Sequence, residues 1–210
     1  MLEKYLKILD KYRSNISNYV DMEIIEKKQN ELNVKFPQSM IDFYIHFGND
    51  KDVLSSFYVL DNVEDIRIEN EVVIFGEKHE GIGCLGIQLE DLNTKSQTVC
   101  WYSYDSKEWY VESGAAIVFF FNTACWQILN TMPSIAKVNL SNAELEKLIG
   151  NDLSYLSEER LLLLGDVITV TGHEILGCYL LDSEELYLGA MTDEILEEYE
   201  ELLEIDLDWL

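Results

Sequence analysis

Residues 25–49 read IEKKQNELNVKFPQSMIDFYIHFGN, and this stretch decides the first part of the fold. Ile25 and Leu32 lie on one face of a helix, and Asn33 follows where asparagine tolerates the left-handed conformation that ends a helix. Pro37 can open the next helix, because its missing N–H costs nothing at the first helical position. Apolar residues then recur at helical spacing until Gly48 ends the helix. We therefore expect helices over residues 21–33, with Asp21 as the candidate N-cap, and over residues 37–47.

The helical apolar period also precedes this stretch, and it changes only after it. An apolar stripe before it predicts a helix over residues 2–13. After it, short runs rich in β-branched and aromatic residues predict strands at 57–60, 71–75, 84–89, 98–104, 108–111 and 115–121. The last run, AAIVFFF, is expected to be a central strand buried on both faces. Asn122 or Thr123 would then cap a helix that continues through Met132.

The helix–break–helix pattern of residues 25–49 resembles the N-terminal motif of the SUKH superfamily, whose best-known branch is the Smi/Knr-type proteins. The resemblance covers roughly residues 20–132. EVVIFGEKHEGIGCLGIQLED, starting at Glu71, is similar to the family's strand–loop–strand, and FFFNTACWQIL, starting at Phe119, is similar to its closing strand and helix. Family members often carry Glu in place of Gln29 and Gly in place of Asn33. The resemblance implies a toxin-binding immunity protein, as many bacterial members are.

The order of these elements predicts an α+β fold, because strands follow one another after the helices instead of alternating with them. We expect N-terminal helices packed on a mostly antiparallel or mixed sheet, a closing helix, and a C-terminal α/β elaboration. The predicted domains are a Smi/Knr-like domain at 1–133 and an acidic helix–hairpin–helix extension at 134–210, packed on the first. A separate small domain is the alternative for this extension.

Within residues 134–210, Ser141 and Glu144 form the pattern of a capping box that opens a short helix. A second helix is expected from Ser157 to Leu164, followed by strands at 167–170, 175–181 and 185–188. Thr192 can cap the final helix, DEILEEYEELLEI.

The chain is strongly acidic, with a formal net charge of −25 over 210 residues. The last fifty residues hold 14 acidic side chains and neither Lys nor Arg. Phosphates and anionic membrane surfaces would be repelled, so we expect neither nucleic acid nor membrane as a partner. A basic protein partner is favoured, because complementary fields accelerate association. The alternative interpretation is that the negative charge mainly keeps the chain soluble.

Four cysteines and three histidines are scattered without the spacing of a metal site or a close disulfide pair. We therefore expect buried free thiols, no metal and no cofactor. The first residues lack the apolar core of a signal peptide, and the longest apolar run is too short to cross a membrane. The expected location is the cytoplasm.

One motif resembles a nucleotide-binding loop: Gly81, Gly83 and Gly86 match GxGxxG. A dinucleotide site needs that loop to open a helix, whereas the residues after Gly86 read as a strand. Neighbouring glutamates would also repel phosphate. We interpret the motif as a turn between strands and expect no enzymatic activity, which leaves a small-molecule enzyme as the least favoured hypothesis.

Two clusters are the candidate partner-binding residues. The first is an aromatic hairpin in which one face is expected to be core and the other a binding surface: Trp101, Tyr102, Tyr104, Trp109 and Tyr110. The second is an acidic group near the C-terminus: Glu197, Glu200, Glu201, Glu204, Asp206 and Asp208. Like charges four residues apart repel along this helix, which suits a surface that meets a basic protein, although a solvated helix face is the simpler reading.

Besides the small-molecule enzyme, these observations favour two hypotheses of function. The first is an immunity protein that binds a cognate secreted toxin, such as a nuclease, and occludes its active site. The second is a Smi/Knr-like regulatory or scaffold protein that binds an endogenous protein. The sequence leaves the toxin, the binding surface and the oligomeric state open.

Overall fold

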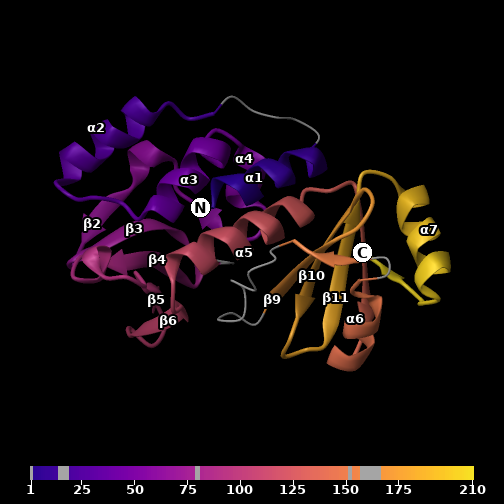
Figure 1. Ribbon diagram of the computed structural model, residues 1–210. Helices are drawn as coiled ribbons and strands as arrows, with labels where there is room; N and C mark the ends of the chain where they lie inside the picture. Colours follow the sequence, from indigo (N-terminus) through magenta and orange to yellow (C-terminus); the bar gives the residue numbers. More distant parts are fainter. Residues whose placement is uncertain (1, 14–18, 79–80, 151–152, 157–166) are drawn as a thin grey trace.

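The computed structural model describes residues 2–13, 19–78, 81–150, 153–156 and 167–210 (Figure 1). Within these ranges the chain forms seven α-helices and two antiparallel sheets, so the predicted α+β class is confirmed. Every pairing between the named strands of the described ranges is antiparallel, and a parallel bridge joins Ile149 to Leu153. None of the helices in the described ranges is long and apolar enough to cross a bilayer.

Four helices precede the first sheet. They are α1 (Glu3–Leu9), α2 (Met22–Leu32), α3 (Gln38–Phe47) and the short α4 (Lys51–Ser55), which the sequence pattern did not predict. A 3₁₀ turn, η1 (Asp10–Tyr12), extends α1. The Asp21 carboxylate accepts the Glu23 N–H and caps α2, whereas Asn33 ends it at φ 53°. The predicted helix-end roles of Asp21 and Asn33 are therefore confirmed.

The first sheet follows with β1 (Val59–Leu60), β2 (Arg67–Glu69), β3 (Val72–Glu77), β4 (Gly83–Gln88), β5 (Val99–Ser103) and β6 (Trp109–Ser113). Its order is β1-β3-β4-β5-β6, with β2 also paired to β3. Val73 and Phe75 of β3 face the helices and join the main core, whereas Val72 and Ile74 belong to a separate cluster on the opposite face.

The expected central strand at 115–121 is wrong. These residues begin α5 (Ala116–Leu129), and Ala115 is its N-cap. The helix therefore starts before the predicted caps at Asn122 and Thr123. A run that is apolar at every position cannot distinguish a buried strand from a buried helix. Here Phe120 packs between Phe43 and Phe75, with centroid distances of 5.4 Å to both rings, so α5 is buried on several sides.

The C-terminal part forms a second sheet of β7 (Ser134–Asn139), β8 (Ser154–Tyr155), β9 (Val167–Thr171), β10 (Ile175–Leu180), β11 (Glu185–Ala190) and β12 (Asp208–Trp209). Its order is β12-β7-β11-β10-β9-β8, so these strands do not extend the first sheet. Instead, α5 packs on β9 and β10, with Leu176 and Cys178 in the same core as α5 (Figure 1).

Two helices accompany the second sheet: α6 (Asn142–Leu148) and α7 (Asp193–Leu203). The predicted capping box of Ser141 and Glu144 is present at the start of α6. Thr192 occupies the N-cap of α7, as expected, but its side chain makes no capping hydrogen bond. The helix predicted from Ser157 to Leu164 lies outside the described residues.

Candidate protein-interaction surfaces

Strand register separates the aromatic residues of the β5–β6 hairpin onto two faces. Trp101 pairs with Tyr110, and Tyr102 pairs with Trp109. Because side chains alternate along a strand, the first pair shares the face that is turned to the helices and the second pair shares the opposite face. Tyr104 lies beside Tyr102, with ring centroids 6.1 Å apart.

The helix-side pair belongs to a supporting network. The Trp101 and Tyr110 rings stack at 5.2 Å, and the Lys78 ammonium lies 4.4 Å from the Trp101 centroid. Lys78 forms an ion pair with Glu112, which also accepts a 2.7 Å hydrogen bond from the Tyr58 hydroxyl. Burial, followed by the Glu112 charge, raises the pKa of Tyr58, so this hydroxyl remains a donor. Trp101, which is half-buried, therefore holds the hairpin against the core, whereas Tyr110 stacks on it from outside and is 41% exposed.

The opposite face carries a second apolar cluster, which we call the outer face. Its members all come from the sheet itself: Val72, Ile74 and Cys84 are buried, and Tyr102 and Trp109 pack on them. Tyr104, which touches Tyr102, is 47% exposed, and Val111, on the same face as Trp109, is 70% exposed. Aromatic side chains that remain accessible on a sheet are suited to protein recognition.

The four described cysteines are buried, as predicted, and none forms a disulfide. Burial raises the pKa of the Cys84 thiol, and it raises that of Cys100 to about 11 and that of Cys178 to about 12. The pKa of Cys125 is raised well above its usual value for the same reason. Protonated thiols are poor nucleophiles, so these cysteines act as small packing residues.

The acidic cluster lies on and just after α7. Glu197, Glu201 and Glu204 are exposed, as are Asp206 and Asp208. Glu200 differs, because it is half-buried and its carboxylate accepts the Leu207 N–H at 2.8 Å. Glu200 thus shapes the turn that follows the helix, while the other five carboxylates face solvent.

The structure does not bring the two predicted clusters together. The hairpin of β5 and β6 belongs to the first sheet, whereas α7 packs on β7 and β11 of the second. In Figure 1 they lie toward opposite ends of the molecule, on either side of α5. A partner that contacts both clusters must therefore span the molecule.

The glycine-rich motif serves strand packing. Gly81 adopts φ 67° in the loop, and the residues from Gly83 form β4 instead of a helix. A Cβ at Gly83 would lie 2.0 Å from the Tyr102 carbonyl oxygen, and one at Gly86 would lie 2.5 Å from the Val72 side chain. The loop consequently lacks the helix N-terminus that binds a pyrophosphate. Across the described residues, no three His, Cys, Asp or Glu side chains gather as metal ligands.

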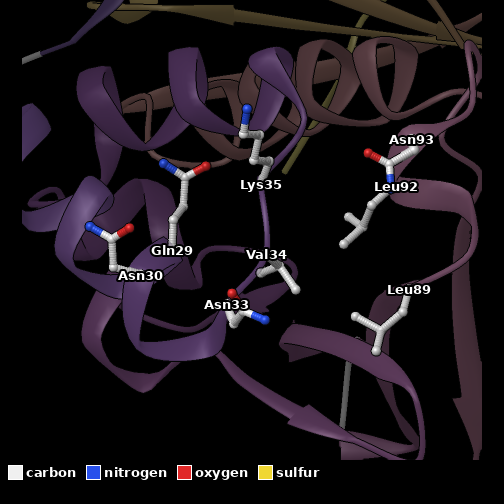
Figure 2. A pocket seen from close by; sticks show the side chains of 8 residues that line it. All are labelled: Gln29, Asn30, Asn33, Val34, Lys35, Leu89, Leu92 and Asn93. Atoms are coloured by element: carbon white, nitrogen blue, oxygen red, sulfur yellow. The ribbon is translucent and has the colours of Figure 1, made fainter.

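Two pockets adjoin at Leu89, which lines both. The first, of about 560 Å³, lies between the end of α2 and the 3₁₀ turn η4 (Asp91–Asn93). Figure 2 shows Val34 on one side of it, facing Leu89 and Leu92 on the other. Gln29 also lines this pocket, where its side-chain oxygen accepts the Phe36 N–H at 2.8 Å. This bond holds the turn between α2 and α3, a role that needs an acceptor and no charge.

The second pocket, of about 410 Å³, lies where the outer face meets the β2–β3 turn. Trp109 lines it together with the carboxylates Glu71 and Glu90. Sequence reasoning identified Trp109 but missed both glutamates. The available signal was a pair of acidic residues flanking β3 and β4, but their proximity to Trp109 depends on how the strands are ordered and packed in the sheet.

Comparisons of this chain with protein-family models, with curated proteins and with solved structures found no match. The resemblance to the SUKH superfamily therefore rests on the sequence motifs alone and stays a prediction.

Proposed function

We propose that this protein is an immunity protein of the SUKH type, which acts in the cytoplasm by binding a cognate secreted toxin. The observation that carries the proposal is the outer face, where the partly exposed Tyr102 and Trp109 and the exposed Tyr104 of the following turn form an aromatic surface. Glu71 and Glu90 line the pocket at its border. An aromatic centre with an acidic border fits a basic protein surface.

Neutralisation would be occlusion without catalysis. A nuclease toxin bears a basic groove for its substrate, and an acidic inhibitor would occupy that groove in place of the phosphate chain. The net charge of −25 would accelerate the encounter, while the aromatic side chains would slow dissociation once they are buried. This division of roles separates the long-range attraction from the short-range contacts.

The test begins with the genes on either side of this one: where one of them encodes a large secreted protein, that protein is co-expressed with this chain, followed by copurification and a growth assay. The expected result is a stable complex and rescue of growth. Trp109→Ala, with a folded far-UV spectrum, should weaken the complex and reduce rescue. Absence of both complex and rescue would contradict the immunity function and favour the regulatory alternative, in which the partner is an endogenous protein recovered from native lysate.

A further inference from the structure

The pocket beside the outer face has a lining whose chemistry is more specific than that of the surrounding surface. Its residues come from the β2–β3 turn, the end of β4 and strand β6: Asn70, Glu71, Val72, Gln88, Leu89, Glu90 and Trp109. The set combines an indole ring, two carboxylates and two side-chain amides in about 410 Å³. In the described part of the chain, no Lys, Arg or His pairs with either carboxylate.

We propose that this pocket receives the guanidinium group of an arginine on the surface of the partner protein, an inference that rests on the proposed function. A guanidinium is planar and always charged, and it presents five N–H donors. It can stack on the Trp109 indole while it donates to the carboxylates of Glu71 and Glu90. The amide oxygens of Asn70 and Gln88 accept the remaining donors.

Other occupants fit this lining less well. An anion would be repelled by the two carboxylates of Glu71 and Glu90, and neither lysine nor arginine lines the pocket. A lysine ammonium would satisfy one carboxylate, but it is a compact, strongly hydrated charge and lacks a planar surface to stack on indole. An apolar side chain would leave both carboxylates without a partner while removing them from water.

The turn that carries Glu71 holds its backbone in an unusual conformation. Asn70 and Glu71 have φ values of 49° and 64°, which fit a type I′ turn. Glycine is the favoured residue at the second of these positions, yet glutamate occupies it here. The Glu71 carbonyl oxygen accepts the Leu89 N–H at 2.8 Å and ties the turn to the end of β4. This backbone hydrogen bond therefore holds Glu71 next to Leu89, the residue that precedes Glu90.

The first experiment is an NMR titration of the full chain with N-acetyl-arginine amide. We expect saturable shifts of the Trp109 indole N–H, identified by its loss in Trp109→Phe, and of the backbone amides of residues 70, 71, 88 and 90. N-acetyl-citrulline amide has the same shape without the charge, so it should bind at least tenfold more weakly. Equal shifts with citrulline, or shifts that map to other surfaces, would overturn the inference.

A matched pair of variants tests the carboxylates. Glu71→Gln with Glu90→Gln removes two charges at the pocket, and we expect about tenfold weaker binding of the arginine amide. The control is Glu174→Gln with Glu184→Gln. Both control residues are exposed glutamates at hairpin turns of the second sheet, and they too have positive φ values, 62° and 54°. Equal weakening by the control would show that net charge alone attracts the probe, which contradicts a defined pocket.

The same variants separate this inference from the proposed function. If the toxin complex forms and rescues growth but Glu71→Gln with Glu90→Gln leaves its dissociation rate unchanged, the arginine pocket is wrong and immunity stands. If the pocket binds the arginine amide and neither complex nor rescue is found, immunity is wrong and the pocket stands. A toxin complex that is weakened by the pocket pair and not by the control pair supports both.

Discussion

Gln127 is a fully buried polar residue that ties α5 to the segment before β1. Its side-chain oxygen accepts the N–H groups of Phe57 and Tyr58, at 2.6 and 3.1 Å, and the Ser56 hydroxyl at 2.9 Å. Its amide group donates to the Tyr58 carbonyl oxygen at 2.8 Å. One side chain therefore satisfies four groups of a connection that has no strand partner of its own.

Replacing this amide should be strongly destabilising. We expect Gln127→Ala to lower the free energy of unfolding by about 3 kcal/mol, because it leaves buried N–H and C=O groups without partners. Chemical denaturation monitored by circular dichroism measures the change. Asn130→Ala, an exposed amide at the end of the same helix, is the control and should cost under about 1 kcal/mol. Equal decreases in the free energy of unfolding of both variants would show that the hydrogen bonds of Gln127 do not stabilise the fold more than an exposed amide does.

His46 is a buried histidine whose titration should make stability depend on pH. It is 3% exposed, and burial lowers its pKa below the usual 6.5, although the nearby Asp10 charge opposes this shift. Below pH 6.5 the unfolded chain therefore binds a proton that the folded chain resists. The free energy of unfolding that the neutral His46 contributes is fully present above pH 6.5. It is lost as the pH falls through the lower pKa of His46 in the folded state.

The measurement is the free energy of unfolding between pH 7.5 and 5.5 for the natural chain and for His46→Phe. The loss on acidification should be smaller in the variant, whatever its absolute stability. His46→Leu serves as a second variant in case phenylalanine packs poorly. Identical pH profiles for all three proteins would contradict a neutral, buried His46.

At the scale of elements, α2 and α7 end in the same backbone conformation with different residues. Asn33 has φ 53° and ψ 42°, and Glu204 has φ 53° and ψ 41°. Asparagine tolerates this left-handed region, whereas glutamate does so poorly. The Glu204 carboxylate also lies at the negative end of the helix dipole.

Glycine at these two positions should therefore have different effects. Glu204→Gly is expected to raise the free energy of unfolding by about 1 kcal/mol, because it relieves the backbone and removes an unfavourable charge. Asn33→Gly should change it by a few tenths of a kcal/mol. Thermal and urea unfolding of both variants provide the comparison. A destabilised Glu204→Gly would show that this side chain makes a stabilising contact that outweighs its strain.

At the scale of the whole molecule, the two candidate surfaces should affect toxin binding through different rate constants. Lysine at both Glu197 and Glu201 should slow association, and high salt should remove the difference, because exposed charges act at long range. Alanine at Trp109 should accelerate dissociation about thirtyfold, as expected for a buried aromatic anchor. Glu200 is a poor choice for charge reversal, since its carboxylate also holds the Leu207 N–H.

Surface plasmon resonance with the copurified toxin domain measures both rate constants. The lysine variant should leave dissociation nearly unchanged, and the Trp109 variant should leave association nearly unchanged. Salt-independent association would remove the electrostatic part of the mechanism. Dissociation unaffected by Trp109→Ala would place the interface away from the outer face.

The sequence by itself determined the features that depend on local physics. The helix ends at Asp21 and Asn33, the capping box at Ser141 and most strand positions follow from backbone preferences and periodicity, which act within a few residues. The acidic imbalance and the buried thiols likewise follow from composition, although the binding roles of the two clusters stay predictions.

Tertiary structure alone decided the rest. Residues 115–121 became the start of a helix because the surrounding rings of Phe43 and Phe75 bury α5 on several sides, a contact between segments far apart in the chain. The second sheet, the separation of the aromatic and acidic clusters, and the meeting of Glu71, Glu90 and Trp109 in one pocket also depend on strand order and tertiary packing. Such proximity is set by packing across the whole molecule, which no local pattern records.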